Sequence, residues 1–416
     1  CWTRPDVLAL EFEDPVVIAR ATGPLQPQEA THHYCNAGRG ADGSIIAHMT
    51  LHPDRARPPG ARVPVQLPGA AHTSYLFRPH QMHPDYQWPH EYATSRSVDG
   101  GRTWSQLQPT EGHNAVPLGD LTLAQQHRAW LVEPGLAVTC LVESGDHGAS
   151  WRERPDVLFR YPPDLPLTPR QDDVSGSVMA LNFENCNTMQ IATDGSLITF
   201  ATAVRQEGDL TWWFPILFRS VDGGFSFDFV SLPCGADKPD DSHGYTEPTL
   251  ARLPNGDLLT VFRVEYHTPM RAMMQCRSSD DGLTWTRPEV CPGVPPVFPA
   301  RKIPVVNTGK THLNAVAVSP DLAVLPNGVI VLTYGRPGQY LAFSEDGSGA
   351  AWHDRVAVVA EHSLFGVNDA SSAMAGVTAI SDDEFLLVYD VRNYQSSTLP
   401  DPANTVFALR GRAAIR

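Results

Sequence analysis

The sequence contains only three lysines, Lys238, Lys302 and Lys310, so arginine carries almost all of its positive charge. Acidic residues outnumber basic ones, and the formal net charge is −15. Nucleic-acid binding requires clustered Lys and Arg facing phosphates, so this class of partner is not expected. No apolar run approaches the roughly 18 residues that a membrane-spanning helix needs, so no membrane span is expected either.

Paired cysteines are also missing, because none of the seven cysteines forms a Cys-x-x-Cys pair. A zinc knuckle or a thioredoxin-type redox site is therefore not expected. His32, His48 and His52 lie near one another in the sequence, but their spacing matches no metal-ligand pattern. The sequence accordingly predicts no metal and no cofactor.

One short motif returns along the chain. It reads Ser-x-Asp-x-Gly-x-Ser/Thr followed by Trp or Phe, and its fifth copy is one residue longer. Asp and Ser side chains bond the backbone of a tight turn, Gly supplies positive φ, and the aromatic ring fills a core. Such turns are structural and identify a fold without indicating any chemistry. Their aspartates are Asp99, Asp146, Asp222, Asp280 and Asp346.

A second repeated signal is a two-residue hairpin turn between apolar runs, such as Asp194-Gly195 or Asn255-Gly256. Together the two signals predict an all-β, six-bladed propeller with five Asp-boxes, in one domain over residues 1–416. The last blade is expected to take a strand from one terminus. Pro-rich insertions are expected at about 53–90 and 286–312, where they border a binding site.

The fourth predicted blade carries the most informative residues. Its inner strand begins Tyr245-Thr-Glu247-Pro, and Arg263 follows the hairpin sixteen residues after Glu247. This pattern resembles the sialidase (neuraminidase) family. The resemblance implies that Glu247 takes the position of the glutamate that polarises the family's catalytic tyrosine. It also implies that Arg263 is one of three arginines that clamp the substrate carboxylate. The fifth blade places Arg336 where a second arginine of the family's carboxylate clamp would lie.

Two positions depart from the sialidase pattern. Where the family has its first clamp arginine, this chain has His33, next to His32. Where the family has its nucleophilic tyrosine, the register falls on or near Met374. Without that tyrosine, cleavage of an ordinary sialic acid by the family's usual route is not expected.

A second carboxylate, Glu184, lies in the third blade near the position equivalent to Glu247. Two carboxylates facing one another suit glycoside hydrolysis. In this respect the chain is similar to the propeller exo-arabinanases, which work with two glutamates and no arginine triad. An exposed or capping role for Glu184, and a purely structural ion pair for Glu247, remain alternatives.

His33 supports a different hypothesis. At the entrance of the first blade it could remove a proton next to a uronate carboxylate, with Arg263 and Arg336 neutralising that carboxylate, as in a polysaccharide lyase. His32 beside it is assigned to substrate binding. Trp212 and Trp213 supply either a sugar-stacking surface or blade core.

The sequence thus favours a secreted, periplasmic or cell-surface, monomeric, exo-acting glycoside hydrolase that cleaves a terminal acidic sugar from an oligosaccharide or polysaccharide. Glu247, Glu184 and His33 are the predicted catalytic residues. Arg263, Arg336, His32 and Tyr245 are the predicted substrate-binding residues. The alternatives are the lyase and a non-catalytic propeller that binds glycans or a protein.

Overall fold

A computed structural model of the chain describes residues 8–20, 35–50, 61–65, 74–78, 92–110, 112–125, 128–171, 178–183, 188–239, 242–265, 273–292, 303–304, 311–312, 318–335, 339–359, 371, 374–394, 396–399 and 403–416. Within these ranges the secondary structure is entirely β, with no helix. They consequently hold no helical segment of the length and apolarity needed to span a membrane.

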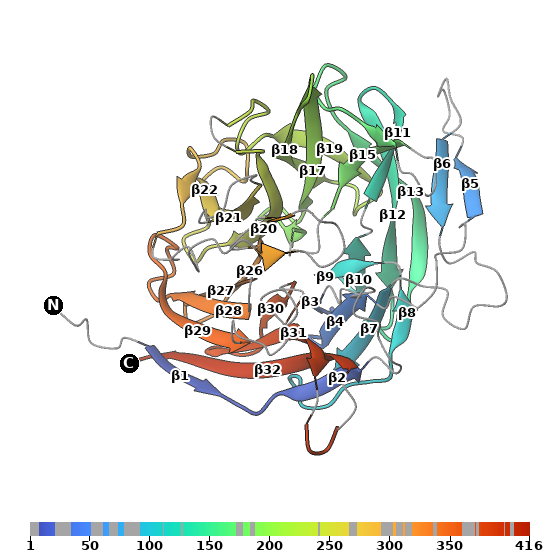
Figure 1. Cartoon of the computed structure of the whole chain (residues 1–416). Coiled ribbons are helices and arrows are strands. Elements are labelled where there is room, and N and C mark those ends of the chain that lie inside the picture. Colours follow the sequence, from blue (N-terminus) through green and yellow to red (C-terminus); the bar gives the residue numbers. More distant parts are fainter. Residues whose placement is uncertain are drawn as a thin grey trace.

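The sheets are arranged around a common centre, with β3, β9, β20, β26 and β30 nearest to it (Figure 1). Three of the sheets have four antiparallel strands in chain order. The first contains β3 (Asn36–Arg39), β4 (Ile45–Thr50), β7 (Tyr92–Ser97) and β8 (Gln108–Thr110). The second contains β20 (Tyr245–Arg252), β21 (Leu258–Val264), β22 (Met274–Ser278) and β23 (Glu289–Val290). The third contains β26 (Val318–Val324), β27 (Ile330–Gly335), β28 (Gln339–Ser344) and β29 (His353–Val359).

Two successive sheets merge into one of eleven strands, because β13 pairs with β19 in parallel and β11 pairs with β15 in the antiparallel sense. Its first part contains β9 (His113–Leu118), β10 (Leu121–Gln125), β11 (Arg128–Glu133), β12 (Leu136–Ser144) and β13 (Arg152–Arg160). Its second part contains β14 (Arg170–Gln171), β15 (Val178–Asn182), β16 (Gln190–Ile191), β17 (Leu197–Glu207), β18 (Leu210–Ser220) and β19 (Ser226–Ser231).

The last sheet joins both ends of the described chain. It contains β30 (Gly376–Ala379), β31 (Glu384–Tyr394) and β32 (Ala403–Ile415), with β1 (Leu8–Phe12) and β2 (Val16–Arg20) both paired to β32. A terminal strand therefore completes the last sheet, as the sequence predicts. This pairing closes the ring, since it leaves no open seam between the first and last sheets.

Two short ladders lie within the predicted insertions. They are β5 (Ala61–Val65) with β6 (Ser74–Arg78), and β24 (Ile303–Pro304) with β25 (Thr311–His312). Most other residues of the two insertions lie outside the described ranges.

Apolar side chains fill the space between neighbouring sheets. Ile46 of β4 packs with Ala115, Ala124 and Val142 of the next sheet, and Trp151 covers this cluster. Strand residues alternate between the two faces of a sheet, so each sheet contributes to two such layers. The core is thus a series of layers around the ring.

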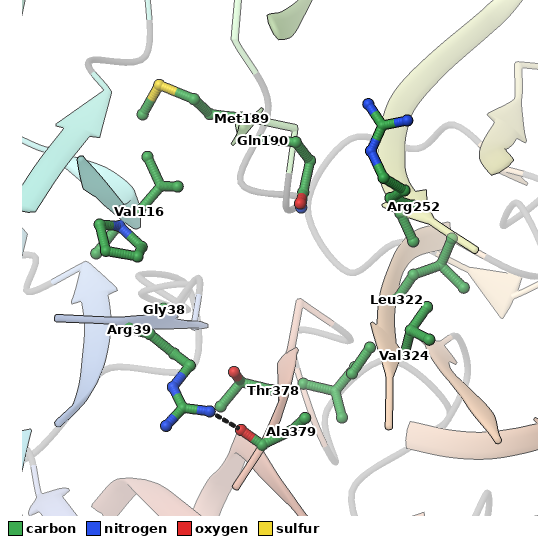
Figure 2. Close-up of a pocket in the computed structure, with 15 residues that line it drawn as sticks. Gly38, Arg39, Val116, Met189, Gln190, Arg252, Leu322, Val324, Thr378 and Ala379 are labelled. Carbon is green, nitrogen blue, oxygen red and sulfur yellow. Dashed lines mark hydrogen bonds between the residues drawn. The ribbon is translucent and has the colours of Figure 1, made fainter. Parts of the chain in front are cut away.

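The inner strands surround a central cavity of about 300 Å³. Figure 2 shows the side chains around it, which come from six separate segments of the chain. Arg39, Arg252, Val324 and Ala379 each end an inner strand, and Arg39 Nη1 donates to the carbonyl oxygen of Ala379 at 2.8 Å. The cavity therefore lies at the hairpin end of the inner strands.

Five turns share one hydrogen-bond arrangement. In each, a Ser hydroxyl bonds the Asp carboxylate and accepts from the amide of a following Gly. In the turn at Asp99, Thr103 also donates to the carboxylate through its amide at 2.9 Å and its hydroxyl at 2.6 Å. None of the five aspartates lines the central cavity.

The turn at Asp99 predicts a pH-dependent contribution to stability. The Thr103 hydroxyl, followed by the Thr103 amide, lowers the pKa of Asp99 to about 2. Because this folded-state pKa lies below the unfolded value of about 3.9, the contribution is complete above pH 4 and is lost as pH falls toward 2. We expect Asp99→Asn to be less stable at pH 7, by about 1 kcal/mol, and to lose less further stability between pH 4 and 2.

Urea unfolding at several pH values measures this effect. Asp120→Asn, at an exposed position in the β9–β10 turn, is the control. Parallel pH profiles for wild type and Asp99→Asn would contradict the prediction.

Candidate functional site

Glu247 lies at a β-bulge near the start of inner strand β20. Thr246 pairs with Arg263 and Thr249 with Val261, so two residues of β20 oppose one residue of β21. Glu247 is the first extra residue, and its φ is 49°. The following proline has no amide hydrogen to donate, and a bulge tolerates this because its extra residues leave the ladder.

The same bulge recurs in two other inner strands, at Asn114 of β9 and Ser319 of β26. Their φ values are 57° and 47°, again positive. A left-handed backbone is uncommon for residues other than glycine and often marks a functional site. Here its repetition shows that the conformation belongs to the scaffold, and only the side chain distinguishes Glu247.

Both carboxylate oxygens of Glu247 have hydrogen-bond donors. Arg263 Nη1 on β21 lies 2.7 Å from Oε1, and the backbone amide of Ser319 on β26 lies 2.7 Å from Oε2. Glu247 is only 5% exposed. The carboxylate therefore joins two strands of its own sheet to the inner strand of the next sheet.

Arg263 contacts a second carboxylate. Its Nη2 lies 3.1 Å from Glu265 Oε1, and the Thr246 hydroxyl donates to the same oxygen at 3.2 Å. Glu265 follows Arg263 by two residues, on the same side of an extended chain. One guanidinium thus lies between two carboxylates, and the three groups together carry one net negative charge.

Met374 lies beside this group, where the sequence register places it. The Ser319 hydroxyl donates to Met374 Sδ, and the Met374 carbonyl oxygen accepts from the amide of Cys35 at 3.3 Å. Ser319 also bonds Glu247, so only one residue separates the thioether from the carboxylate. A thioether is no substitute for a tyrosine nucleophile.

Tyr245 is half-buried, with its ring centroid 6.0 Å from that of Phe262. Just before it, Gly244 forms an isolated parallel bridge with Trp213 of β18. Trp213 is half-buried under the guanidinium of Arg170, at 5.3 Å. Trp212 is 2% exposed and bonds the carbonyl of Ala236, which makes it a core residue.

His48, one of the histidines near the first blade, is enclosed in the protein. Its Nδ1 lies 2.8 Å from the carbonyl oxygen of Gly112. Burial lowers the pKa of His48 to about 4, so its imidazole is neutral at physiological pH. The described residues contain no group of three or more metal-ligating side chains around it or elsewhere.

The structure brings together two of the predicted site residues, Glu247 and Arg263, and places Tyr245 two residues away along β20. The others lie outside the described residues, namely His32, His33, Glu184 and Arg336. Sequence reasoning missed Glu265 and Ser319. The available signals were the two-residue spacing from Arg263 and the Ser-Pro pair that matches Glu247-Pro.

The central cavity is separate from this site. Glu247 lies five residues before Arg252, and five residues of an extended strand span roughly 16 Å. The bulges and the cavity therefore lie toward opposite ends of the inner strands.

The described residues thus form an all-β ring of sheets (Figure 1). The chain belongs to the BNR repeat-like domain family, which matches residues 115–385. No curated protein sequence matches the chain.

Solved structures show the same fold across nearly the whole chain. A protein of unknown function from Dyadobacter fermentans aligns with a TM-score of 0.60 and 14% identity, covering 98% of this chain and 99% of that one. An α-L-arabinanase from Penicillium chrysogenum, complexed with arabinobiose, aligns with a TM-score of 0.53 and 13% identity, covering 95% and 98%. The sialidase of Trypanosoma rangeli aligns with a TM-score of 0.51 and 14% identity, covering 95% of this chain and 59% of that one. At these identities the likeness concerns the fold.

The buried pair predicts strong energetic coupling between Glu247 and Arg263. Arg263→Met removes a charged partner of a buried carboxylate, and we expect a loss of roughly 3–5 kcal/mol in the free energy of unfolding. The double variant with Glu247→Gln should be less destabilised than the sum of the single variants.

Chemical unfolding of the four proteins in this cycle measures the coupling. Arg160→Met is the control, because Arg160 pairs with Asp228 on the surface, where we expect a change below about 1 kcal/mol. Additive single effects would show that the two groups do not stabilise one another.

Proposed function

We propose that this protein is an exo-acting glycoside hydrolase of sialidase-like fold that removes a terminal sugar from an oligosaccharide or polysaccharide. The observation that carries the proposal is the hydrogen-bonded carboxylate of Glu247 at the opening of an inner strand, facing Arg263. The arabinanase and the sialidase share the fold and support a carbohydrate substrate.

Glu247 suits the role of the unprotonated carboxylate. Both oxygens already accept hydrogen bonds, from Arg263 and from the Ser319 amide, so the side chain is arranged to accept and not to donate. In glycoside hydrolysis, positive charge develops on the sugar ring as the glycosidic bond breaks. A carboxylate fixed by two donors stabilises that charge, or attacks or activates water on the ring face.

The remaining roles fall to residues predicted from the sequence. A second carboxylate must protonate the departing oxygen, and Glu184 is our candidate. His33 and His32 would contact the sugar, with Arg336 and Tyr245 completing the binding site. In the lyase alternative His33 would instead be the base, and the product would carry a double bond.

The proposal extends to the organisation of the protein. The six segments around the central cavity support six blades in one domain over residues 1–416, with the five Asp-box turns outside it. We propose that the protein acts as a monomer on glycans outside the cytoplasm.

The test is the substitution Glu247→Gln, which keeps the side-chain volume and removes the charge. We expect turnover of the best substrate in a panel of aryl glycosides to fall by a factor on the order of a hundred or more. The variant should fold with a lowered melting temperature, because Gln Oε1 can accept from only one of the two donors while Arg263 keeps Glu265 as a partner.

Glu289→Gln is the matched control, because Glu289 is exposed on the outer strand β23 of the same sheet. Uronate polysaccharides in the same panel, followed by absorbance, would reveal the elimination product of a lyase. A folded Glu247→Gln variant that keeps a third of wild-type turnover would overturn the role of Glu247.

A further inference from the structure

We propose that Glu265 is a specificity-determining residue, which makes the site at Glu247 select neutral sugars and reject anionic ones. This inference rests on the proposed function and specifies neutral sugars as the substrate class of the proposed hydrolase. The sequence favoured an acidic sugar instead. Binding of an acidic sugar would require Arg263 to present a positively charged face to the ligand.

The charges around Arg263 carry the argument. Its two terminal nitrogens face different carboxylates, Glu247 through Nη1 and Glu265 through Nη2. A guanidinium recognises a ligand carboxylate most strongly when two N–H groups point toward it in parallel. Here the two terminal nitrogens are directed at protein carboxylates, and the charge of the guanidinium is more than balanced.

Exposure shows which carboxylate a ligand meets first. The side chain of Glu265 is 25% exposed, whereas that of Glu247 is 7% and that of Arg263 is 16% exposed. Glu265 is thus the most accessible member of the group. An anionic sugar approaching Arg263 would have to pass or displace a like charge, whereas the hydroxyls of a neutral sugar can donate to it.

Glu265 is held in place by its backbone. Its amide donates to the carbonyl of Gly244 at 2.9 Å, and its carbonyl accepts from the amide of His243 at 2.7 Å. The His243 carbonyl in turn accepts from the amide of Trp213 at 2.9 Å, which ties the segment to β18. The Thr246 hydroxyl also donates to the Glu265 carboxylate, so hydrogen bonds hold both the backbone and the side chain of Glu265. Displacing it would break an arrangement that spans two sheets.

The test compares sugars that differ only in charge. Ligand-observed NMR or calorimetry would measure the binding of methyl glucoside against methyl glucuronide and of methyl galactoside against methyl galacturonide. For wild type we expect the neutral member of the preferred pair to bind on the order of tenfold more tightly. Glu265→Gln should abolish this preference by strengthening binding of the acidic member, with little change for the neutral one.

Two variants separate charge from structure. Glu265→Asp retains the charge and should retain the preference. Glu384→Gln removes a partly exposed carboxylate that pairs with Arg410 in the last sheet, and it should behave like wild type. Tighter binding of acidic sugars by wild type, or an unchanged preference in Glu265→Gln, would overturn the inference, as would the absence of binding by every pair.

The aryl glycoside assay distinguishes this failure from failure of the proposed function. Hydrolysis without a charge preference would overturn the role of Glu265 and leave the hydrolase intact. A charge preference in binding without hydrolysis would support the role of Glu265 and overturn the hydrolase.

Discussion

The structure depends on buried carboxylates that hold neighbouring inner strands together. Glu247 joins β20 and β21 to the Ser319 amide of β26. Two residues beyond Ser319, the fully buried Asp321 accepts from the Thr249 hydroxyl of β20 and from the Val377 amide of β30. A buried charge is tolerated only when donors satisfy it, so each carboxylate fixes the spacing of the strands that supply its donors. The candidate site is therefore built from the same kind of contact that joins neighbouring inner strands.

A β-bulge with positive φ recurs in three inner strands, while the residue at the bulge differs from sheet to sheet. The bulge with positive φ occurs at Asn114, Glu247 and Ser319, so it exists whether or not the residue can perform chemistry. Because the bulge interrupts pairing at the opening of an inner strand, it directs a side chain away from the regular ladder. Of these three residues only Glu247 carries a carboxylate, so its side chain alone gives one bulge an acidic group.

The parts of the structure that the sequence predicted well depend on local chemistry. The turn at Asp99 needs only Ser97, Gly101 and Thr103, all within a few residues. The contact of Glu247 with Arg263 follows from one hairpin, since the two residues lie on paired strands. The sequence did not predict the parallel pairing of β13 with β19, because nothing local specifies which outer strands meet. The Ser-Pro pair marks the bulge at Ser319, but nothing local shows that the Ser319 amide meets a carboxylate of another sheet. Glu265 was missed because its proposed effect on charge selectivity depends on how the Arg263 guanidinium is oriented, which the sequence does not specify.

An arginine at the opening of a sheet can serve ligand binding or folding, and these two tasks require different partners. An arginine kept for ligand binding should present donors to the ligand, whereas one kept for folding should face the carboxylates it neutralises. Arg263 is of the second kind in the described residues, with Glu247 on one side and Glu265 on the other. Its first task is to make a buried glutamate tolerable at the bulge, since an unpaired carboxylate there would be costly. The presence of Arg263 is therefore weak evidence for an acidic sugar, and its pairing with Glu265 is what supports our proposal of a neutral one.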